Sequence, residues 1–198
     1  MTAPAFKLTD LFDIPMNKAY LPELQKWGQA ARNIARGSAD NTKVGCIILD
    51  KQFNPLATGC NNFAAGLDVP DRLMKNRDWK INNITMAEEG ALHAMMRNGI
   101  PMQNRLLITT HYPSVREAML IGACGIKDVF VDHAGFTDRF LNNWSAAIVE
   151  GQQIMAAQGI TVSGLAIPLT DKIVDRLPIP QGEYRTGYAI NELPTLTK

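Results

Sequence analysis

The sequence has few of the features that mark secreted or membrane proteins. Its 198 residues include only three cysteines, Cys46, Cys60 and Cys124, which stand far apart and form no C-x-x-C pair. This pattern favours buried thiols in a reducing compartment over a disulfide framework. No apolar run approaches the roughly 18 residues of a transmembrane helix. The first residues also lack a basic segment followed by an apolar one, which is the pattern of a signal peptide. We therefore expect a cytoplasmic protein with no membrane partner.

An excess of charge of one sign is also missing. The chain has 20 Lys and Arg residues against 19 Asp and Glu residues, a formal net charge of +1, and no long basic run. A basic patch is the usual footprint of a nucleic-acid-binding protein, so we do not expect nucleic acid as a partner. What the chain does have is 46% hydrophobic residues. That fraction suits one domain with a substantial core.

Hydrophobic periodicity divides the chain into an N-terminal arm (1–19), one domain (20–167) and a C-terminal extension (168–198). The domain is predicted to contain a helix over 20–36, strands over 44–49 and 56–60, a polar loop over 61–84, a helix over 86–98, a strand over 105–110, a helix over 114–123, a strand over 127–132, a helix over 137–158 and a strand over 160–166. Strands and helices alternate after residue 86, which predicts an α/β fold with parallel strands and helices on both faces. A loop as long as 61–84 is commonly functional or a lid.

Two helix starts carry the most informative pattern in the chain. Glu88 follows Met86 by two residues at the first start, and Pro113-Ser114 precedes Glu117 at the second. Zinc nucleotide deaminases carry H-x-E and P-C-x-x-C in this layout. The chain resembles the deoxycytidylate (dCMP) deaminase branch of the cytidine deaminase family. Further stretches agree with the family pattern in the same order, more loosely between 71 and 80: residues 34–36, 38–48, 59–62, 71–73, 77–80, 99–110 and 123–127.

The resemblance implies a three-layer α/β/α fold with a mixed five-stranded sheet. It also implies a pyrimidine nucleotide ligand of the dCMP, dUMP or dTMP type and a homo-oligomer. The nucleotide-binding residues that it implies are Asn61, Ser38, Thr110, Tyr112 and Ser114. Glu88 stands at the place of the family's proton-shuttling carboxylate.

All three metal ligands of the family are replaced. Met86 stands where the His belongs, and Ser114 and Glu117 stand where the two Cys belong. Zinc lowers the pKa of its bound water from about 15.7 to about 7, which is worth on the order of 10 kcal/mol toward making the nucleophile. A positioned carboxylate supplies only about 10²–10⁴-fold. A thioether and a neutral hydroxyl are poor zinc donors. We therefore expect no catalytic zinc, no other cofactor and no classical dCMP deaminase activity.

Each of these residues also has a purely structural interpretation. Glu88 and Glu117 suit the first turn of a helix, where the dipole favours carboxylates. Met86 can fill the core, Asn61 is an ordinary turn residue, and Cys124 can be a small buried apolar residue. The histidines His93 and His111 could in principle help to bind a metal, but neither falls at a family ligand position.

Three functions remain open at the level of sequence. The first, which we favour, is a nucleotide-binding protein without zinc. The second is an enzyme that acts on a pyrimidine nucleotide with Glu88 and Glu117 as its catalytic acids. The third is a non-catalytic subunit of a deaminase-type oligomer. In the family fold the two acids converge, so we expect them within hydrogen-bonding range, directly or through a water. Two close carboxylates disfavour double ionisation, so the pKa of one should rise.

Overall fold

The fold is a mixed β-sheet between two layers of helices. This computed structural model describes residues 12, 20–64, 67–136, 138–167 and 188–189. The N-terminal arm and the C-terminal extension lie almost entirely outside the described residues. The strands, in chain order, are β1 (Gly45–Leu49), β2 (Pro55–Cys60), β3 (Leu106–Thr109), β4 (Asp128–Asp132), β5 (Thr161–Leu165) and the two-residue β6 (Tyr188–Ala189). The helices are α1 (Leu21–Ala35), α2 (Asp71–Met74), α3 (Arg77–Asn83), α4 (Ala87–Arg97), α5 (Val115–Ala123) and α6 (Asp138–Ala157).

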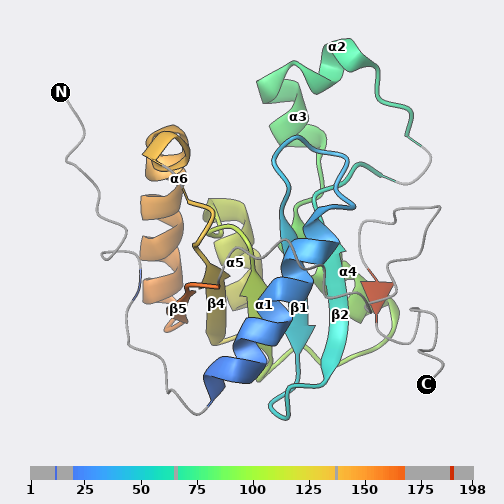
Figure 1. The fold of residues 1–198 in the computed structure, drawn as a ribbon. Helices are drawn as coiled ribbons and strands as arrows, with labels where there is room; N and C mark the ends of the chain where they lie inside the picture. The colour runs from blue at the N-terminus through green and yellow to red at the C-terminus, as the bar shows by residue number, and fades with distance from the viewer. Residues whose placement is uncertain (1–11, 13–19, 65–66, 137, 168–187, 190–198) are drawn as a thin grey trace.

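The sheet has the order β5-β4-β3-β1-β2-β6 (Figure 1). Strand β1 pairs antiparallel with both β2 and β3, whereas β3–β4 and β4–β5 are parallel pairs. The parallel pairs are the ones joined through α5 and α6, because a parallel connection needs a crossover that a helix supplies. The mixed five-stranded sheet is thus confirmed, and β6 adds a short strand that pairs with the outer edge of β2.

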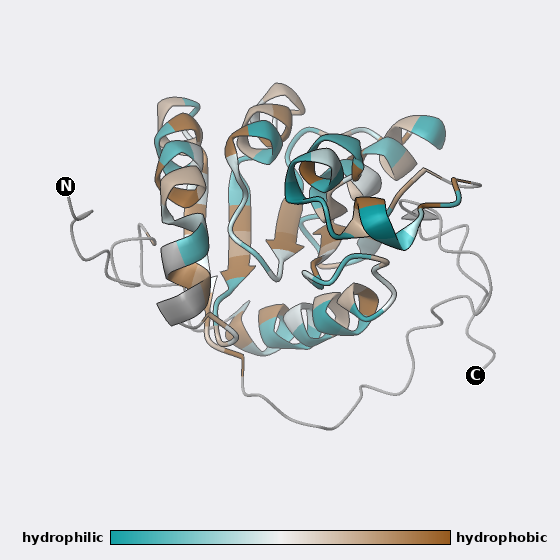
Figure 2. Cartoon of the chain, turned by 90° about the horizontal axis from the view of Figure 1, so that it is seen from above, coloured by the Kyte–Doolittle hydropathy of each residue, from teal (hydrophilic) through white to brown (hydrophobic). Residues whose placement is uncertain are grey.

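Helices cover both faces of the sheet, as Figure 2 shows from above. Helix α1 packs on one face, where the core contains Ile47, Leu49 and Ile108. Helices α4, α5 and α6 lie against the other face, where the core contains residues from the alternate positions of the same strands, such as Ile48 and Leu107. Because successive strand residues point to opposite faces, these continuous apolar runs fill two cores at once.

Glycine at one position sets the distance between the sheet and the helix that carries Glu88. A Cβ atom on Gly59 would lie 2.1 Å from the backbone oxygen of Ala87. Only a residue without a side chain therefore lets β2 approach the first turn of α4. The neighbouring Asn61 completes the contact, since its Oδ1 accepts a hydrogen bond from the Ala87 backbone N–H at 3.0 Å.

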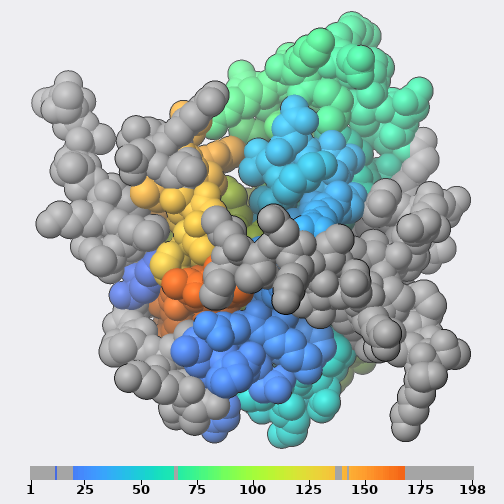
Figure 3. All heavy atoms as spheres, viewed as in Figure 1, coloured from blue at the N-terminus to red at the C-terminus, as the bar shows by residue number. Residues whose placement is uncertain are grey.

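The region predicted as an irregular loop, 61–84, is partly helical and corrects the sequence interpretation. Its helices α2 and α3 are short, and their start signals are local ones. Pro70 precedes α2, and the Asn76 side chain caps α3 by accepting from the Trp79 backbone N–H at 3.0 Å. Four- and seven-residue helices are too short to show a clear apolar period. In Figure 3 this green segment projects at one end of the molecule. Among the described helices, none is long and apolar enough to cross a membrane.

Candidate functional site

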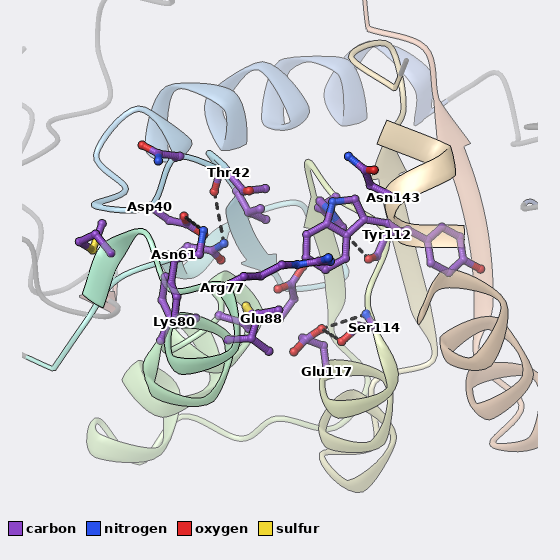
Figure 4. A pocket seen from close by; sticks show the side chains of 18 of the residues that line it. Asp40, Thr42, Asn61, Arg77, Lys80, Glu88, Tyr112, Ser114, Glu117 and Asn143 are labelled. Atoms are coloured by element: carbon purple, nitrogen blue, oxygen red, sulfur yellow. Dashed lines mark hydrogen bonds and ion pairs between the residues drawn. The ribbon is translucent and has the colours of Figure 1, made fainter. Parts of the chain in front are cut away.

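A cavity of about 480 Å³ opens where the starts of α4 and α5 meet the α2–α3 segment and α6 (Figure 4). Several of the sequence-predicted site residues line it, namely Asn61, Met86, Glu88, Tyr112, Ser114 and Glu117. Figure 4 shows Glu88, Ser114 and Glu117 on one side, Asp40 and Lys80 on another, and Arg77 reaching between them. The structure therefore brings the two predicted acids to one cavity.

Glu88 is a buried acid with a strongly perturbed proton affinity. The residue is only 3% exposed, and its carboxyl accepts a hydrogen bond from the hydroxyl of Thr109. Burial and the nearby charge of Glu117 raise the pKa of Glu88 to about 8, and the Thr109 hydrogen bond opposes that rise. Burial disfavours the charged form of a carboxyl, and a neighbouring negative charge acts in the same direction. At neutral pH, Glu88 is therefore mostly protonated and can donate a hydrogen bond.

Glu117 is buried as well, but its two oxygens differ. Oε2 accepts from the backbone N–H of Ser114 at 2.9 Å and from the Ser114 hydroxyl at 2.6 Å. This is a capping arrangement, in which the third residue of a helix reaches back to its N-cap. Oε1 is buried and has no hydrogen-bond partner within the described part of the chain, although Arg116 Nε lies 3.9 Å away. Two donors at Oε2 and the helix N-terminus are surroundings that suit a carboxylate, and the negative charge of Glu117 is one of the causes that act on Glu88.

The nucleotide-binding residues implied by the resemblance separate into two groups. Asn61, Tyr112 and Ser114 line the cavity, whereas Ser38 and Thr110 are not part of its lining. The Ser38 hydroxyl donates to the Asn61 backbone oxygen at 2.7 Å and accepts from the Asp40 N–H at 3.0 Å. The Thr110 hydroxyl accepts from the Gly45 N–H at 3.0 Å. In this structure, Ser38 and Thr110 therefore hold the walls of the site together.

The side chain of Asn61 also has a structural role. Besides accepting from Ala87, its Nδ2 donates to the Thr42 backbone oxygen at 3.3 Å. Its side chain thus joins the end of β2, the loop before β1 and the start of α4. One hydrogen of the amide remains for a ligand in the cavity.

The cavity has a cationic side that the sequence analysis missed. Lys75, Arg77 and Lys80, from the α2–α3 segment, are part of its lining. Lys80 Nζ forms an ion pair with Asp40 Oδ1 at 2.6 Å. The guanidinium carbon of Arg77 lies 5.1 Å from the ring centroid of Trp144 on α6, within cation–π range. The sequence signal was present as three cations within six residues of a long loop, but their convergence depends on how α2 and α3 fold.

The two candidate histidines lie in different places. His93 is exposed on α4 and is not part of the cavity lining. His111 is part of it, and its Nδ1 lies 2.8 Å from the Tyr112 backbone oxygen. Burial lowers the pKa of His111, so the imidazole is neutral at neutral pH. Since a backbone oxygen only accepts, Nδ1 carries the proton and Nε2 is left as an acceptor.

The donors at the three family metal positions do not fit a zinc site. Met86 offers a thioether, and the Ser114 hydroxyl donates its proton to Glu117. Only the Glu117 carboxylate is a good zinc ligand, whereas a catalytic zinc needs three protein ligands. Over the described ranges, no three or more His, Cys, Asp or Glu side chains form a group that could hold a metal ion.

Comparisons with known proteins agree with the fold. Two solved structures of dCMP deaminase from the cyanophage S-TIM5 are similar to this chain. The apo form is 21% identical with a TM-score of 0.55, over 75% of this chain and 99% of that one. The complex with dCMP and dUMP is 20% identical with a TM-score of 0.58, over 76% of this chain and 99% of that one. A search of curated protein sequences gives no match.

The family of this chain is assigned from a family model, because the low identity to the solved structures shows only a shared fold. The model that describes the cytidine and deoxycytidylate deaminase zinc-binding region matches residues 22–133, more than half of the chain. The match includes β1 to β4 and both helix starts that carry Glu88 and Glu117. The chain therefore belongs to the cytidine and deoxycytidylate deaminase family.

Proposed function

We propose that this protein binds a pyrimidine nucleoside monophosphate without hydrolysing its amino group. The observation that carries the proposal is the composition of one cavity, which has an acid pair on one side and cations on another. A nucleotide has the complementary composition, since its base edge offers hydrogen-bond donors and acceptors and its phosphate is an anion. The cyanophage relative of the same fold was solved with dCMP and dUMP, which favours this class of ligand.

The acid pair suits the edge of a pyrimidine base. Protonated Glu88 offers an O–H donor, and Glu117 Oε1 offers an acceptor that no described residue satisfies. A buried polar atom left without a partner costs about 1–3 kcal/mol. A ligand that donates to Oε1 and accepts from Glu88 would remove that cost. Cytosine and uracil edges both present a donor next to an acceptor.

The cationic side suits the phosphate. Arg77 and Lys75 are exposed at the mouth of the cavity, so they can reach an anion without first losing a buried partner. Charge-assisted hydrogen bonds to phosphate are about twice as strong as neutral ones. The rings of Tyr112 and Trp144 also line the cavity and offer apolar surface to a base or sugar. We therefore expect monophosphates to bind more tightly than the corresponding nucleosides.

Hydrolysis is not part of the proposal because the site lacks a means of generating hydroxide near neutral pH. The donor set does not fit zinc, and general acid–base assistance alone supplies about 10²–10⁴-fold. The lowering of the water pKa that zinc supplies is worth on the order of 10 kcal/mol. Deamination at an ordinary enzymatic rate is therefore not expected.

A second candidate function is favoured by one observation. A protonated Glu88 beside an ionised Glu117 is the arrangement of a general acid with a general base. Such a pair could act on a pyrimidine nucleotide in a reaction that needs proton transfer but no metal-bound water. This enzyme candidate and the binding candidate use the same cavity and differ only in whether the bound nucleotide changes.

The test is calorimetry with dCMP, dUMP and dTMP, alongside deoxycytidine and deoxyuridine, followed by mass analysis of the recovered ligand. We expect binding of at least one monophosphate, weaker binding of its nucleoside, and recovery of the ligand unchanged. Loss of binding in Glu88→Gln and Glu117→Gln is expected if the acid pair holds the base. Absence of binding by all five compounds would refute the proposal. A changed nucleotide would replace it with the enzyme candidate.

A further inference from the structure

The α2–α3 segment, residues 67–84, has a fixed base on the domain. The Asn62 backbone N–H donates to the Thr85 oxygen at 3.0 Å, and the Thr85 N–H donates to the Asn62 oxygen at 2.9 Å. Arg116 adds a contact at the same place, since its Nη2 donates to the Ile84 backbone oxygen at 2.9 Å. From this base the segment projects at one end of the molecule, where its residues line the cavity (Figure 1).

Beyond this base, the segment has little apolar anchorage. Neither α2 nor α3 contains a buried residue, and the side chains of Leu73, Met74 and Ile81 are only half-buried. Trp79 packs on Phe63, which follows the base in the chain, with ring centroids 5.9 Å apart. Regions with few buried apolar contacts open at a lower free energy than the rest of a fold. Polar contacts therefore decide how firmly the segment lies against the cavity.

Lys80 of α3 provides the first of these contacts. Its Nζ pairs with Asp40 Oδ1 at 2.6 Å, and the two side chains are only 16% and 6% exposed. Asp40 is itself held, because its N–H donates to the Ser38 hydroxyl at 3.0 Å. That hydroxyl donates in turn to the Asn61 backbone oxygen at 2.7 Å. The ion pair therefore ties α3 to the loop before β1, on one wall of the cavity (Figure 4).

Arg77, the first residue of α3, provides the second contact. Its guanidinium carbon lies over the ring of Trp144 on α6, 5.1 Å from the ring centroid, which is within cation–π range. The Trp144 ring also meets the His111 ring edge-on, with centroids 5.5 Å apart and planes at 89°. The second contact therefore ties α3 to a different wall of the cavity, the one that α6 forms.

We propose that residues 67–84 form a lid over the cavity, that Asp40 and Trp144 are positioning residues that hold this lid closed, and that the phosphate of a bound nucleotide stabilises the closed lid through Arg77. This inference rests on the proposed function and gives the means by which its site selects monophosphates over nucleosides. Arg77 is part of the lid, so a phosphate gains its contact with Arg77 only when the lid is closed. A ligand that binds one state more tightly shifts the population toward that state.

Arg77 can contact Trp144 and a phosphate at the same time. A guanidinium commonly stacks on an aromatic ring by its face, while its N–H donors lie in its plane. The cation–π contact therefore leaves donors for charge-assisted hydrogen bonds to phosphate. Lys80 differs, because its ammonium group is already paired with Asp40. Lys80 thus holds the lid, whereas Arg77 both holds the lid and binds the ligand.

The test is hydrogen–deuterium exchange of the full-length protein, read by mass spectrometry over α3, with α1 as the reference. Without ligand, Asp40→Asn should speed exchange in α3 by roughly 10-fold or more, because removing one charge of a buried ion pair is strongly destabilising. Trp144→Leu should speed it by roughly 3-fold, as expected for the loss of an exposed cation–π contact. Trp144→Phe should retain part of the protection, since phenylalanine keeps an aromatic face. Exchange in α1 should stay as in the wild type.

The matched control is Asp128→Asn, which removes the same charge from another lysine–aspartate pair. Asp128 pairs with Lys51 at the opposite end of the sheet, where β1 ends and β4 begins. This substitution should leave exchange in α3 unchanged. If Asp40→Asn does not fold, Lys80→Gln breaks the same ion pair from the side of the lid.

The same experiment with ligand compares dCMP and dUMP with deoxycytidine and deoxyuridine. We expect the monophosphates to slow exchange in α3, the nucleosides to leave it unchanged, and Arg77→Gln to abolish the difference. Unchanged α3 exchange in folded, ligand-free Asp40→Asn and Trp144→Leu proteins would overturn the inference, as would equal slowing by monophosphates and nucleosides. If none of the four compounds binds, the proposed function fails, and the ligand-free variants still decide whether Asp40 and Trp144 hold a lid.

Discussion

The hydroxyl of Thr109, the last residue of β3, donates a hydrogen bond to the carboxyl of Glu88 in the first turn of α4. Both side chains are buried. The bond crosses from the sheet to the helix layer and joins residues that are 21 positions apart. It gives the acid a fixed orientation toward the cavity, and among the described side chains Thr109 alone donates a hydrogen bond that acts against the rise in the Glu88 pKa.

Thr109→Val should raise the pKa of Glu88 above its wild-type value of about 8, because the lost donor favours the charged carboxylate. At pH 6 the variant should also lose about 1 kcal/mol of stability, the usual contribution of one hydrogen bond. The measurement is urea unfolding from pH 5 to pH 9.5. In a Glu88→Gln background, Thr109→Val should leave the pH dependence unchanged. An equal change in both backgrounds would show that the effect does not act through Glu88.

Glu88→Gln should flatten the dependence of stability on pH. The folded pKa of Glu88, about 8, is higher than the ordinary value of 4.5. Between these two values the folded protein keeps a proton that the unfolded chain releases, so stability is full below about pH 4.5 and falls as pH rises through 8. The loss is on the order of a few kcal/mol. Glutamine stays neutral, so the variant should be more stable than the wild type at pH 8.5.

The control for that experiment is Glu23→Gln, at an exposed acid on α1 whose side chain is 52% accessible. It removes the same charge and should leave the pH dependence as it is in the wild type. Parallel stability curves for the wild type and Glu88→Gln across this range would mean that Glu88 is ionised in the folded protein, against the mechanism argued above.

The elements that the sequence predicts best are those whose apolar pattern is long or continuous. Helix α1 has a clear 3.6-residue period, and the buried runs of β1 and β3 differ from the predicted strands by at most one residue at each end. The convergence of Glu88 and Glu117 on one cavity was also predictable, because both follow helix starts within a matched family pattern. These features depend on local sequence or on the order of elements.

Other features depend on contacts between distant residues and could not be predicted from local patterns. Ile84, whose backbone oxygen accepts from Arg116, is 32 positions away from it. Arg116 contacts Glu89, 27 positions away, and Arg32 pairs with Asp132, 100 positions away. Nothing in the composition around either arginine marks its partner, because an ion pair is selected by the folded geometry.

Arg77→Gln should weaken binding of a nucleoside monophosphate by roughly 10-fold or more, since a hydrogen bond to a charged group contributes about 1.5–3 kcal/mol. Binding of the corresponding nucleoside should change little. The matched control is Arg72→Gln, because Arg72 is exposed on α2 and is not part of the cavity lining. The two variants are compared by calorimetry with the monophosphate and the nucleoside at two salt concentrations. Equal weakening by the two substitutions would mean that the effect comes from general charge attraction.

The last prediction concerns zinc. The wild-type protein should purify without stoichiometric zinc, because Met86 and Ser114 are poor donors and Ser114 bonds to Glu117. The triple variant Met86→His, Ser114→Cys and Glu117→Cys restores the family ligands at the two helix starts. It should bind about one zinc per chain, since one imidazole and two thiolates are the donors of the deaminase site.

Elemental analysis of metal content after dialysis checks both halves of the zinc prediction. Met86→His alone is the control, because it adds one good ligand without the two thiolates and should not hold zinc. Zinc in the wild type at about one per chain, lost in Glu117→Ala, would contradict the proposal of a zinc-free site. Failure of a folded triple variant to bind zinc would show that the two helix starts have moved away from the ligand geometry of the family. In that case the positions of Met86, Ser114 and Glu117 would no longer correspond to a metal site that substitution can restore.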